Sequence, residues 1–229
     1  MPKTIVVVGF GPGVSTGMAD KFGAKGFSVA LVGRSQDRLA EGVRALRTAG
    51  VTAAAFVADA GDPTAIRAAL AKARAELGPI TVLHWNAFDS ANRLNLVTAG
   101  PDEVRGAFDV AVVGLLAAVQ EALPDLKAAG DGAVLITNGA LGDLAPMMDQ
   151  FAIGLNAVGV ALGNAAKAKL IGLLAAQLQP EGVYVGEVTI AGAIKGTPTG
   201  NDLGIEPATV AEAFWTLYQT RGGIRARVP

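Results

Sequence analysis

The sequence contains no cysteine and few of the side chains that usually perform acid–base catalysis. Its 229 residues include one His, two Tyr and two Trp. Without cysteine there is no disulfide framework, no thiolate nucleophile and no zinc finger. A single histidine excludes a histidine-rich metal site. We therefore expect no bound metal, and any catalytic site must be built from a small set of residue types.

An excess of charge of either sign is also missing. The 19 Lys and Arg residues balance 20 Asp and Glu residues, which leaves a formal net charge of −1. This balance gives no electrostatic reason to expect nucleic acid or an anionic membrane surface as a partner. A hydrophobic content of 51% excludes a disordered chain. We expect instead a folded protein whose partner is a small molecule.

Long uninterrupted apolar runs are absent. The apolar run at Ile5–Val8 is too short for the core of a secretory signal. The longest apolar stretch, Phe151–Leu178, contains two Asn and two Lys residues and therefore predicts a buried helix rather than a membrane span. We expect a soluble, cytoplasmic protein.

Short β-branched runs alternate with helical patterns along the whole chain. Most of these runs are nearly all apolar, as in strands that are covered on both faces. A last helix begins at Pro207, and Ile224–Val228 alternates apolar and charged residues as an edge strand does. The alternation predicts an α/β fold: a Rossmann-type, doubly wound parallel sheet in a three-layer α/β/α arrangement. The predicted strands are Ile5–Val8, Ser28–Val32, Ala54–Val57, Ile80–Leu83, Ala133–Thr137 and Val183–Ile190.

No linker rich in Ser, Gly or Pro divides the chain, so we expect residues 1–229 to form a single domain. The one long irregular stretch, Gly192–Glu206, contains one Pro and four Gly residues, and Pro207 follows it directly. A loop that follows a late strand of an open α/β sheet lies over the crevice at the carboxyl ends of the strands. We expect residues 192–206 to act as a lid.

A glycine-rich turn, Gly9-Phe-Gly-Pro-Gly13, follows the first predicted strand directly and precedes a helix. Its spacing is G-x-x-x-G-x-G, with Ser15 at the last position. Glycines let the backbone approach a phosphate and leave helix N–H groups aimed at it. The turn favours nucleotide binding, although a tight strand-to-helix turn needs glycine for its own geometry.

With this turn in place, nearly the whole chain resembles the short-chain dehydrogenase/reductase family. The resemblance implies that an NAD(P) cofactor contacts the turn through Gly9, Gly11, Gly13, Val14 and Ser15. The second strand ends in Gly33-Arg34-Ser35 and offers no carboxylate to a ribose 2′-hydroxyl. Arg34, assisted by Ser35, implies a preference for NADP, because a guanidinium suits a 2′-phosphate. The alternative is a solvated arginine at a strand end.

Other segments match the family in order along the chain. Asp59, with Ala60, resembles the residue that contacts the adenine ring. The pair Asn86-Ala87 resembles the second half of the family's Asn-Asn-Ala-Gly motif and is largely structural. By the same similarity, Ile194 and Thr197 would touch the carboxamide and the pyrophosphate of the cofactor. We expect His84, inside the fourth strand, to be a core residue rather than a catalyst.

The catalytic positions of the family are all occupied by other residues. The family uses a Tyr as general acid, a Lys four residues later, a Ser and an Asn. Ala111 stands at the Asn position, and Asn138 or Gly139 at the Ser position. Counting forward from Gly139 puts the Tyr and Lys positions at Ala152 and Asn156; counting back from the sixth strand puts them at Val160 and Asn164, which we favour.

These matches leave more than one function open. The first hypothesis is an NADPH-preferring oxidoreductase that acts on an unknown carbonyl or alcohol through a non-standard acid–base site. The second is a catalytically silent nucleotide-binding sensor or scaffold, and the third a lyase or isomerase that reuses the pocket. Asn138 and Asn164 also have structural interpretations, as a turn cap and as an interface residue. The family's oligomers pair through the helix predicted at Phe151–Leu178, which implies a homodimer or homotetramer.

Overall fold

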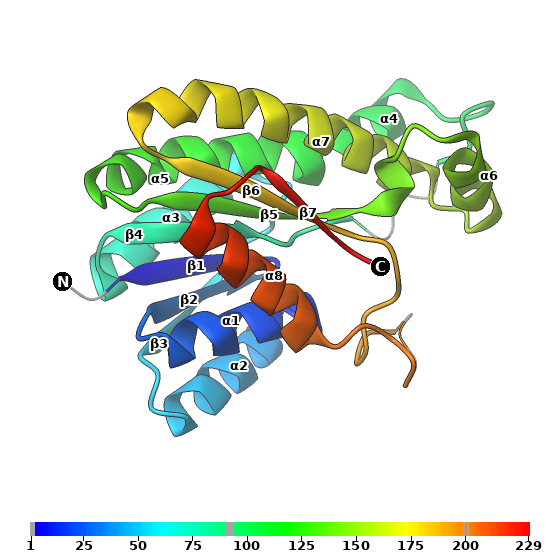
Figure 1. The fold of residues 1–229 in the computed structure, drawn as a ribbon. Helices are drawn as coiled ribbons and strands as arrows, with labels where there is room; N and C mark the ends of the chain where they lie inside the picture. Colours follow the sequence, from blue (N-terminus) through cyan, green and yellow to red (C-terminus); the bar gives the residue numbers. More distant parts are fainter. Residues whose placement is uncertain (1–2, 90–93, 199, 201) are drawn as a thin grey trace.

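One sheet of seven parallel strands organises the protein in the computed structural model, which describes residues 3–89, 94–198, 200 and 202–229 (Figure 1). The strand order is β3-β2-β1-β4-β5-β6-β7, and every neighbouring pair is parallel. This order confirms the predicted single-domain, doubly wound fold. The strands are β1 (Thr4–Val8), β2 (Ser28–Gly33), β3 (Ala53–Val57), β4 (Ile80–Trp85), β5 (Ala133–Gly139), β6 (Tyr184–Ile190) and β7 (Arg225–Val228).

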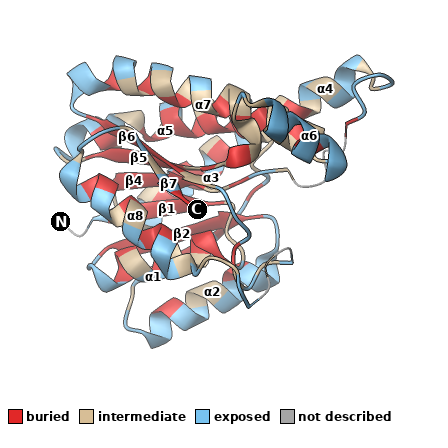
Figure 2. Ribbon diagram, turned by 45° about the vertical axis from the view of Figure 1, so that its right-hand side comes forward, coloured by how far each residue is buried: buried red, intermediate tan, exposed pale blue. Residues whose placement is uncertain are grey.

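Helices cover both faces of the sheet (Figures 1 and 2). One face carries α1 (Val14–Ala24), α2 (Gln36–Thr48) and α8 (Pro207–Thr220), and the other carries α3 (Pro63–Leu77), α5 (Leu115–Ala128) and α7 (Val158–Leu178). Two short helices, α4 (Pro101–Phe108) and α6 (Pro146–Gly154), lie beyond the carboxyl ends of the strands. The shorter turns are η1 (Asp109–Gly114), η2 (Ala140–Gly142) and η3 (Gln179–Glu181).

The apolar character of the strands follows from this double cover. Every residue of β1, β2 and β4 is buried. Alternate side chains of β1 enter the two separate cores, with Val6 on the α3–α5–α7 face and Val7 on the α1–α8 face. Strands covered on both faces need apolar residues at successive positions rather than at alternate ones.

The prediction of a single helix over Phe151–Leu178 is wrong for the first third of that range. The structure ends α6 at Gly154 and begins α7 at Val158. Between them Asn156 adopts a left-handed backbone with φ of +52°. Asparagine is one of the few non-glycine residues that tolerates this conformation, and a left-handed residue ends a right-handed helix. The break places Val160 and Asn164 in the first two turns of α7.

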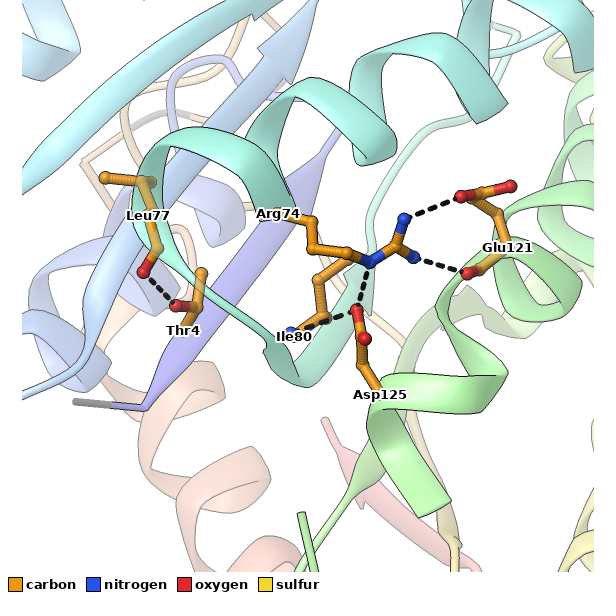
Figure 3. Close-up of polar contacts among 6 residues, drawn as sticks. All are labelled: Thr4, Arg74, Leu77, Ile80, Glu121 and Asp125. Atoms are coloured by element: carbon orange, nitrogen blue, oxygen red, sulfur yellow. Dashed lines mark hydrogen bonds and ion pairs between the residues drawn. The ribbon is translucent and has the colours of Figure 1, made fainter. Parts of the chain in front are cut away.

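A polar network ties α3 to α5 at the end of the sheet opposite to α4 and α6 (Figure 3). Arg74 donates from Nε to Asp125 at 2.6 Å and from Nη1 to the Glu121 carboxylate at 2.9 Å. Asp125 also accepts the backbone N–H of Ile80, the first residue of β4, at 3.3 Å. Burial opposes the charge of Arg74, but the hydrogen bonds to the two carboxylates leave its pKa above the usual value.

Two helical stretches, Pro101–Ala128 and Val158–Glu181, are long and apolar enough to cross a membrane by length and composition alone. The first comprises α4, η1 and α5, and the second comprises α7 and η3. Here α5 packs on α3 and β4, and α7 packs on β5, β6 and η1. Helices that bury one side against a central sheet commonly have this composition, so the two stretches do not by themselves indicate a membrane.

We expect Gly114→Ala to lower the free energy of unfolding by about 1–3 kcal/mol, the usual cost of overpacking. A β-carbon at Gly114 would overlap the backbone carbonyl oxygen of Ala60. The matched control is Gly172→Ala in α7, where the nearest atom to a β-carbon is Nη2 of Arg225 at 3.7 Å. This control should raise stability by about 0.5–1 kcal/mol, because alanine favours a helix interior. Equal denaturant midpoints for the two variants would contradict the packing described.

Candidate functional site

The strand order reverses at β1 and β4, and the loops that follow these two strands meet at their carboxyl ends. Gly9 has φ of +84°, and a β-carbon on it would lie 2.5 Å from the Cα atom of Ala87. Asn86 donates from its side-chain amide to the Gly9 carbonyl at 3.3 Å and from its backbone N–H to Val8 at 2.9 Å. The first glycine of the turn is therefore required for the close approach of two strand ends. A crevice at such a reversal is where open α/β sheets bind ligands.

The side chain of Ser15 stabilises the glycine-rich turn by hydrogen bonds to its backbone. Its buried hydroxyl accepts the backbone N–H of Gly11 at 2.9 Å and donates to the carbonyl of the same residue at 2.9 Å. The backbone N–H groups of Gly9 and Phe10 both donate to the Val32 carbonyl at 2.9 Å. The turn is thus fixed by its own hydrogen bonds, and serine takes the third glycine position as a structural element.

The N-terminus of α1 is left open for an anion. Its N-cap, Gly13, provides no side-chain cap, and the first turn contains no acidic residue. A β-carbon on Gly11 would meet nothing within 4 Å. Uncapped N–H groups and the positive end of the helix dipole together favour a phosphate at this position.

The loop predicted as a lid contacts this turn. A β-carbon on Gly13, whose φ is +94°, would lie 2.8 Å from Thr197 and 3.0 Å from Ile194. The base of the loop is closed by a bridge between Ile194 and Ile205. The side chain of Thr197 donates to the Ile194 carbonyl at 2.7 Å. Positions 199 and 201 of the predicted lid lie outside the described residues.

The predicted cofactor residues on the β2–β3 side lie at the same edge. Arg34 is exposed at the end of β2, where it makes no hydrogen bond or ion pair with a residue that the structure describes. Ser35 is the N-cap of α2 and accepts the Arg38 N–H at 3.4 Å. Asp59 is exposed and accepts the Gly61 N–H at 2.9 Å, and Ala60 lies against Gly114. Arg34 directly follows Gly33, where a β-carbon would lie 3.4 Å from the carbonyl oxygen of Phe10 in the glycine-rich turn.

On the β5 side, the structure brings Gly139 and Asn164 together. A β-carbon on Gly139 would lie 2.8 Å from Nδ2 of Asn164, so the amide of Asn164 fills the space that a larger residue at 139 would take. Ala111, in η1, lies against Gly163, where a β-carbon would be 3.1 Å away. Val160 is half-buried in the first turn of α7. Ala152 is buried in α6, and Asn156 is exposed in the turn that follows.

Asn164 is the more unusual member of this pair. Its residue is 6% exposed, and its amide is not among the fully buried side-chain atoms that lack a hydrogen-bond partner among the described residues, which are Nδ1 of His84 and Nε1 of Trp85. Asn138, by contrast, is fully engaged: Nδ2 donates to the Asn164 carbonyl at 3.2 Å and to Glu187 at 2.8 Å. Asn138 is thus held by the protein itself, whereas the amide of Asn164 lies against the bare backbone of Gly139.

Comparison with known proteins agrees with this geometry. The family model described as short chain dehydrogenase matches residues 3–204. The chain belongs to this family. Its members are NAD(P)-dependent oxidoreductases, and the expectation drawn from the glycine-rich turn is confirmed at that level.

Curated relatives match part of this short-chain dehydrogenase. The 3-dehydrosphinganine reductase TSC10B of Arabidopsis thaliana is 33% identical over 127 residues, which cover 55% of this chain and 37% of the relative. The short-chain reductase protein NovJ of Streptomyces niveus is 34% identical over 111 residues, which cover 48% of this chain and 42% of the relative. The matches thus span less than half the length of these relatives.

Solved structures match over nearly the whole chain. A short-chain dehydrogenase from Rhodopseudomonas palustris has a TM-score of 0.80 and 23% identity, covering 99% of this chain and 98% of the other. An NADPH-bound short-chain oxidoreductase from Pseudomonas aeruginosa PAO1, described as containing an atypical catalytic center, has a TM-score of 0.82 and 21% identity. It covers 99% of this chain and 95% of its own. At this identity the likeness shows the fold alone.

The sequence patterns did not identify two buried charged residues near the site. Lys167 was not recognised as part of the site, and Glu187 was not recognised as a candidate at all. Each is 2% exposed, in α7 and β6 respectively. A signal was present in both cases. Lys167 lies on the buried stripe of α7 that continues through Ile171 and Leu174, and Glu187 interrupts an apolar strand. A charged residue at a buried position of an apolar pattern needs a partner, and for Glu187 the structure supplies Arg225, whose Nε lies 2.8 Å from Oε2.

We expect His84 to remain neutral throughout the pH range in which the protein is folded. Burial lowers the pKa of His84 to about 3, from 6.5. Its Nε2 lies 3.1 Å from the Thr137 hydroxyl, and Nδ1 has no partner among the described residues. Since the sequence has one histidine, a single imidazole signal in NMR reports on it. This signal should not shift between about pH 8 and about pH 5.

The same pKa has a consequence for stability. Between pH 6.5 and about 3 the unfolded chain binds a proton at His84 that the folded protein does not. The free energy of unfolding should therefore fall as the pH falls through this window. An imidazole titration centred near pH 6.5 would contradict the buried, neutral state of this side chain.

Proposed function

We propose that this short-chain dehydrogenase binds NADPH in preference to NADH and interconverts a carbonyl compound and an alcohol through a non-standard acid–base site. The observation that carries the proposal is the open phosphate cradle at Gly11 and the α1 N-terminus, with the exposed guanidinium of Arg34 beside it. Several similar structures hold NADP or NADPH, which supports this choice of cofactor.

The residues around this crevice fit a dinucleotide. The turn from Gly9 to Ser15 would hold the pyrophosphate, and Arg34 with Ser35 the 2′-phosphate, since bidentate guanidinium bonds suit a phosphate. Asp59 and Ala60 would border the adenine, and Asn86 and Ala87 would border a ribose of the cofactor. Ile194 and Thr197, which already contact the turn, would reach the carboxamide and the pyrophosphate. When bound, NADPH would supply the hydride that reduces a carbonyl.

On the β5 side of the crevice, the residue that would contact the reacting carbonyl is Asn164. We place the family's Tyr and Lys positions at Val160 and Asn164, because Asn164 lies against Gly139, the Ser position. An asparagine amide donates a hydrogen bond to a developing oxyanion but does not give up a proton at neutral pH. In reduction, Asn164 therefore holds the carbonyl oxygen, and water supplies the proton that completes the hydroxyl group.

The substrate we propose is an apolar carbonyl compound. Large apolar side chains stand exposed at the carboxyl edge of the sheet, beside the site, in the segments around α6 and after β4. Clusters of exposed apolar residues at a binding edge commonly mark the surface that a ligand covers. The matched Arabidopsis thaliana proteins are named as reductases of 3-dehydrosphinganine, which is consistent with this class. The exposed residues are Leu96, Val97, Leu144, Met147, Phe151 and Leu155.

A second candidate function is a catalytically silent nucleotide-binding protein. It is favoured by the residues at the family's catalytic positions, which carry no hydroxyl and no charge: Ala111, Asn138 or Gly139, Val160 and Asn164. The two candidates differ in one observable. NADPH that binds but is not oxidised by any member of a broad carbonyl panel would support the silent protein. Pairing through α7 into a homodimer or homotetramer, closure of residues 192–206 as a lid, and a cytoplasmic location stay predictions for both.

We expect Arg34→Asp to weaken NADPH binding by about 10- to 100-fold, because charge-assisted hydrogen bonds contribute about 1.5–3 kcal/mol. Affinity for NADH should stay within about twofold, since NADH has no 2′-phosphate to lose. Titration of cofactor fluorescence measures both constants. Arg44→Asp, an exposed position further along α2, is the matched control and should change neither. Equal losses for the two cofactors would refute the 2′-phosphate assignment.

For wild type, kcat/KM should rise with chain length across a series of unbranched aldehydes from propanal to decanal, because each buried methylene contributes about 0.8 kcal/mol. The double variant Met147→Ser with Phe151→Ser should lower kcat/KM for decanal by about tenfold and leave propanal unchanged. Leu173→Ser, on the outward face of α7, serves as the control for an exposed apolar residue away from this edge. A kcat/KM that does not change with aldehyde chain length would contradict an apolar substrate.

A further inference from the structure

A threonine hydroxyl lies on β5 two residues before Gly139, on the strand face to which a side chain at 139 would point. Successive side chains of a strand alternate between its two faces, so Leu135, Thr137 and Gly139 share one face of β5. Leu135 is fully buried in the core under α1 and α8, whereas Thr137 is partly exposed. Because Gly139 has no side chain, β5 itself places nothing between the Thr137 hydroxyl and the crevice.

The single histidine of the chain contacts this hydroxyl. Nε2 of His84 lies 3.1 Å from Oγ1 of Thr137. The His84 ring is fully buried, and Phe214 packs edge-on against it, with 5.1 Å between the ring centroids and 70° between the ring planes. The imidazole therefore has a fixed position and orientation behind Thr137.

Burial also determines which ring nitrogen of His84 carries the proton. The ring is neutral, because burial lowers the pKa of His84 to about 3, so one nitrogen carries a proton and the other is a bare acceptor. Nδ1 is buried and has no partner among the described residues. Buried N–H groups without an acceptor are rare in proteins, and under-satisfied acceptors are somewhat less so. The proton therefore lies on Nε2, from which His84 donates to Oγ1 of Thr137.

This bond leaves the hydroxyl proton of Thr137 available, since a hydroxyl that accepts a hydrogen bond still donates its own proton. No residue that the structure describes accepts a hydrogen bond from Thr137. The amide of Asn164 lies on the same side, with Nδ2 2.8 Å from the position of a β-carbon on Gly139. Positions 137 and 139 are about 6–7 Å apart along the strand, so one substrate oxygen between the two groups lies within reach of both donors.

We propose that Thr137 is a catalytic residue whose hydroxyl donates a hydrogen bond to the substrate carbonyl oxygen, and that His84 is the positioning residue that turns this hydroxyl toward the crevice. The inference rests on the proposed reduction of a carbonyl compound. In this role Thr137 keeps its proton. It shares with Asn164 the negative charge that develops on the oxygen during reduction, and water still supplies the proton of the product alcohol. The hydroxyl that is missing at position 139 is thereby supplied from position 137.

Steady-state kinetics test the role of the hydroxyl. Thr137→Val keeps the shape of the side chain without the hydroxyl, and it should lower kcat for the reduction of decanal by about 100-fold, the usual cost of removing one oxyanion donor. KM for decanal and the dissociation constant of NADPH should stay within about twofold, because the lost bond strengthens only in the transition state. Thr137→Ser keeps the hydroxyl and should recover most of kcat. Thr81→Val, at a buried position at the opposite end of β4, is the matched control and should change none of these values.

NMR of the ring nitrogens tests the role of His84 without any turnover. In the wild-type protein, the chemical shifts of the two nitrogens should show the proton on Nε2. Thr137→Val should shift the Nε2 signal, because the donated bond loses its acceptor, and Thr81→Val should leave it in place. A proton on Nδ1 would overturn the inference whatever the activity. Thr137→Ala replaces Thr137→Val in both experiments if the valine variant does not fold.

The outcomes separate this inference from the proposed function. In a wild-type protein that reduces decanal, a kcat that Thr137→Val leaves unchanged would overturn the inference alone. Equal losses of kcat in Thr137→Val and Thr137→Ser would also overturn it, because they would assign the effect to packing rather than to the hydroxyl. Wild-type protein that binds NADPH but reduces no carbonyl compound would overturn the proposed function, and the catalytic role of Thr137 with it.

Discussion

The contact between Gly9 and Ala87 is the constraint on which the rest of the site depends. It brings the ends of β1 and β4 together at the point where the strand order reverses, and a β-carbon on Gly9 would lie 2.5 Å from the Cα atom of Ala87. The glycine-rich turn is then fixed to β2 through Val32, and Gly13 packs beneath Ile194 and Thr197. These contacts leave the α1 N-terminus uncapped and facing the crevice. The phosphate site that we propose would therefore result from close packing of the backbone rather than from any single side chain.

The opposite wall combines two replacements that match one another in space. Gly139 has no side chain, and the amide of Asn164 occupies the space that a side chain there would take. Below this contact, Asn138 is held by Glu187, which forms an ion pair with Arg225. In the function that we propose, this wall supplies a hydrogen-bond donor to an oxyanion and water supplies the proton.

The sequence predicted the fold closely because strands covered on both faces carry an apolar signal that does not depend on distant contacts. The glycine-rich turn and Arg34 could likewise be recognised from their spacing along the chain. The break between α6 and α7 was missed because the apolar pattern continues through it, and only the left-handed backbone at Asn156 reveals it. Glu187 and Arg225 lie in separate strands, 38 residues apart in the sequence, so their ion pair depends on how β6 and β7 pair. Periodicity within one element cannot supply that register.

The most direct measurement is a crystal structure of the protein with NADPH bound. We predict the 2′-phosphate within hydrogen-bonding distance of the Arg34 guanidinium and the pyrophosphate at the N-terminus of α1. We also predict that C4 of the nicotinamide faces the wall formed by Gly139 and Asn164, with Asn138 still bonded to Glu187. A nicotinamide turned away from Asn164, or a 2′-phosphate that lies free of Arg34 in solvent, would contradict it.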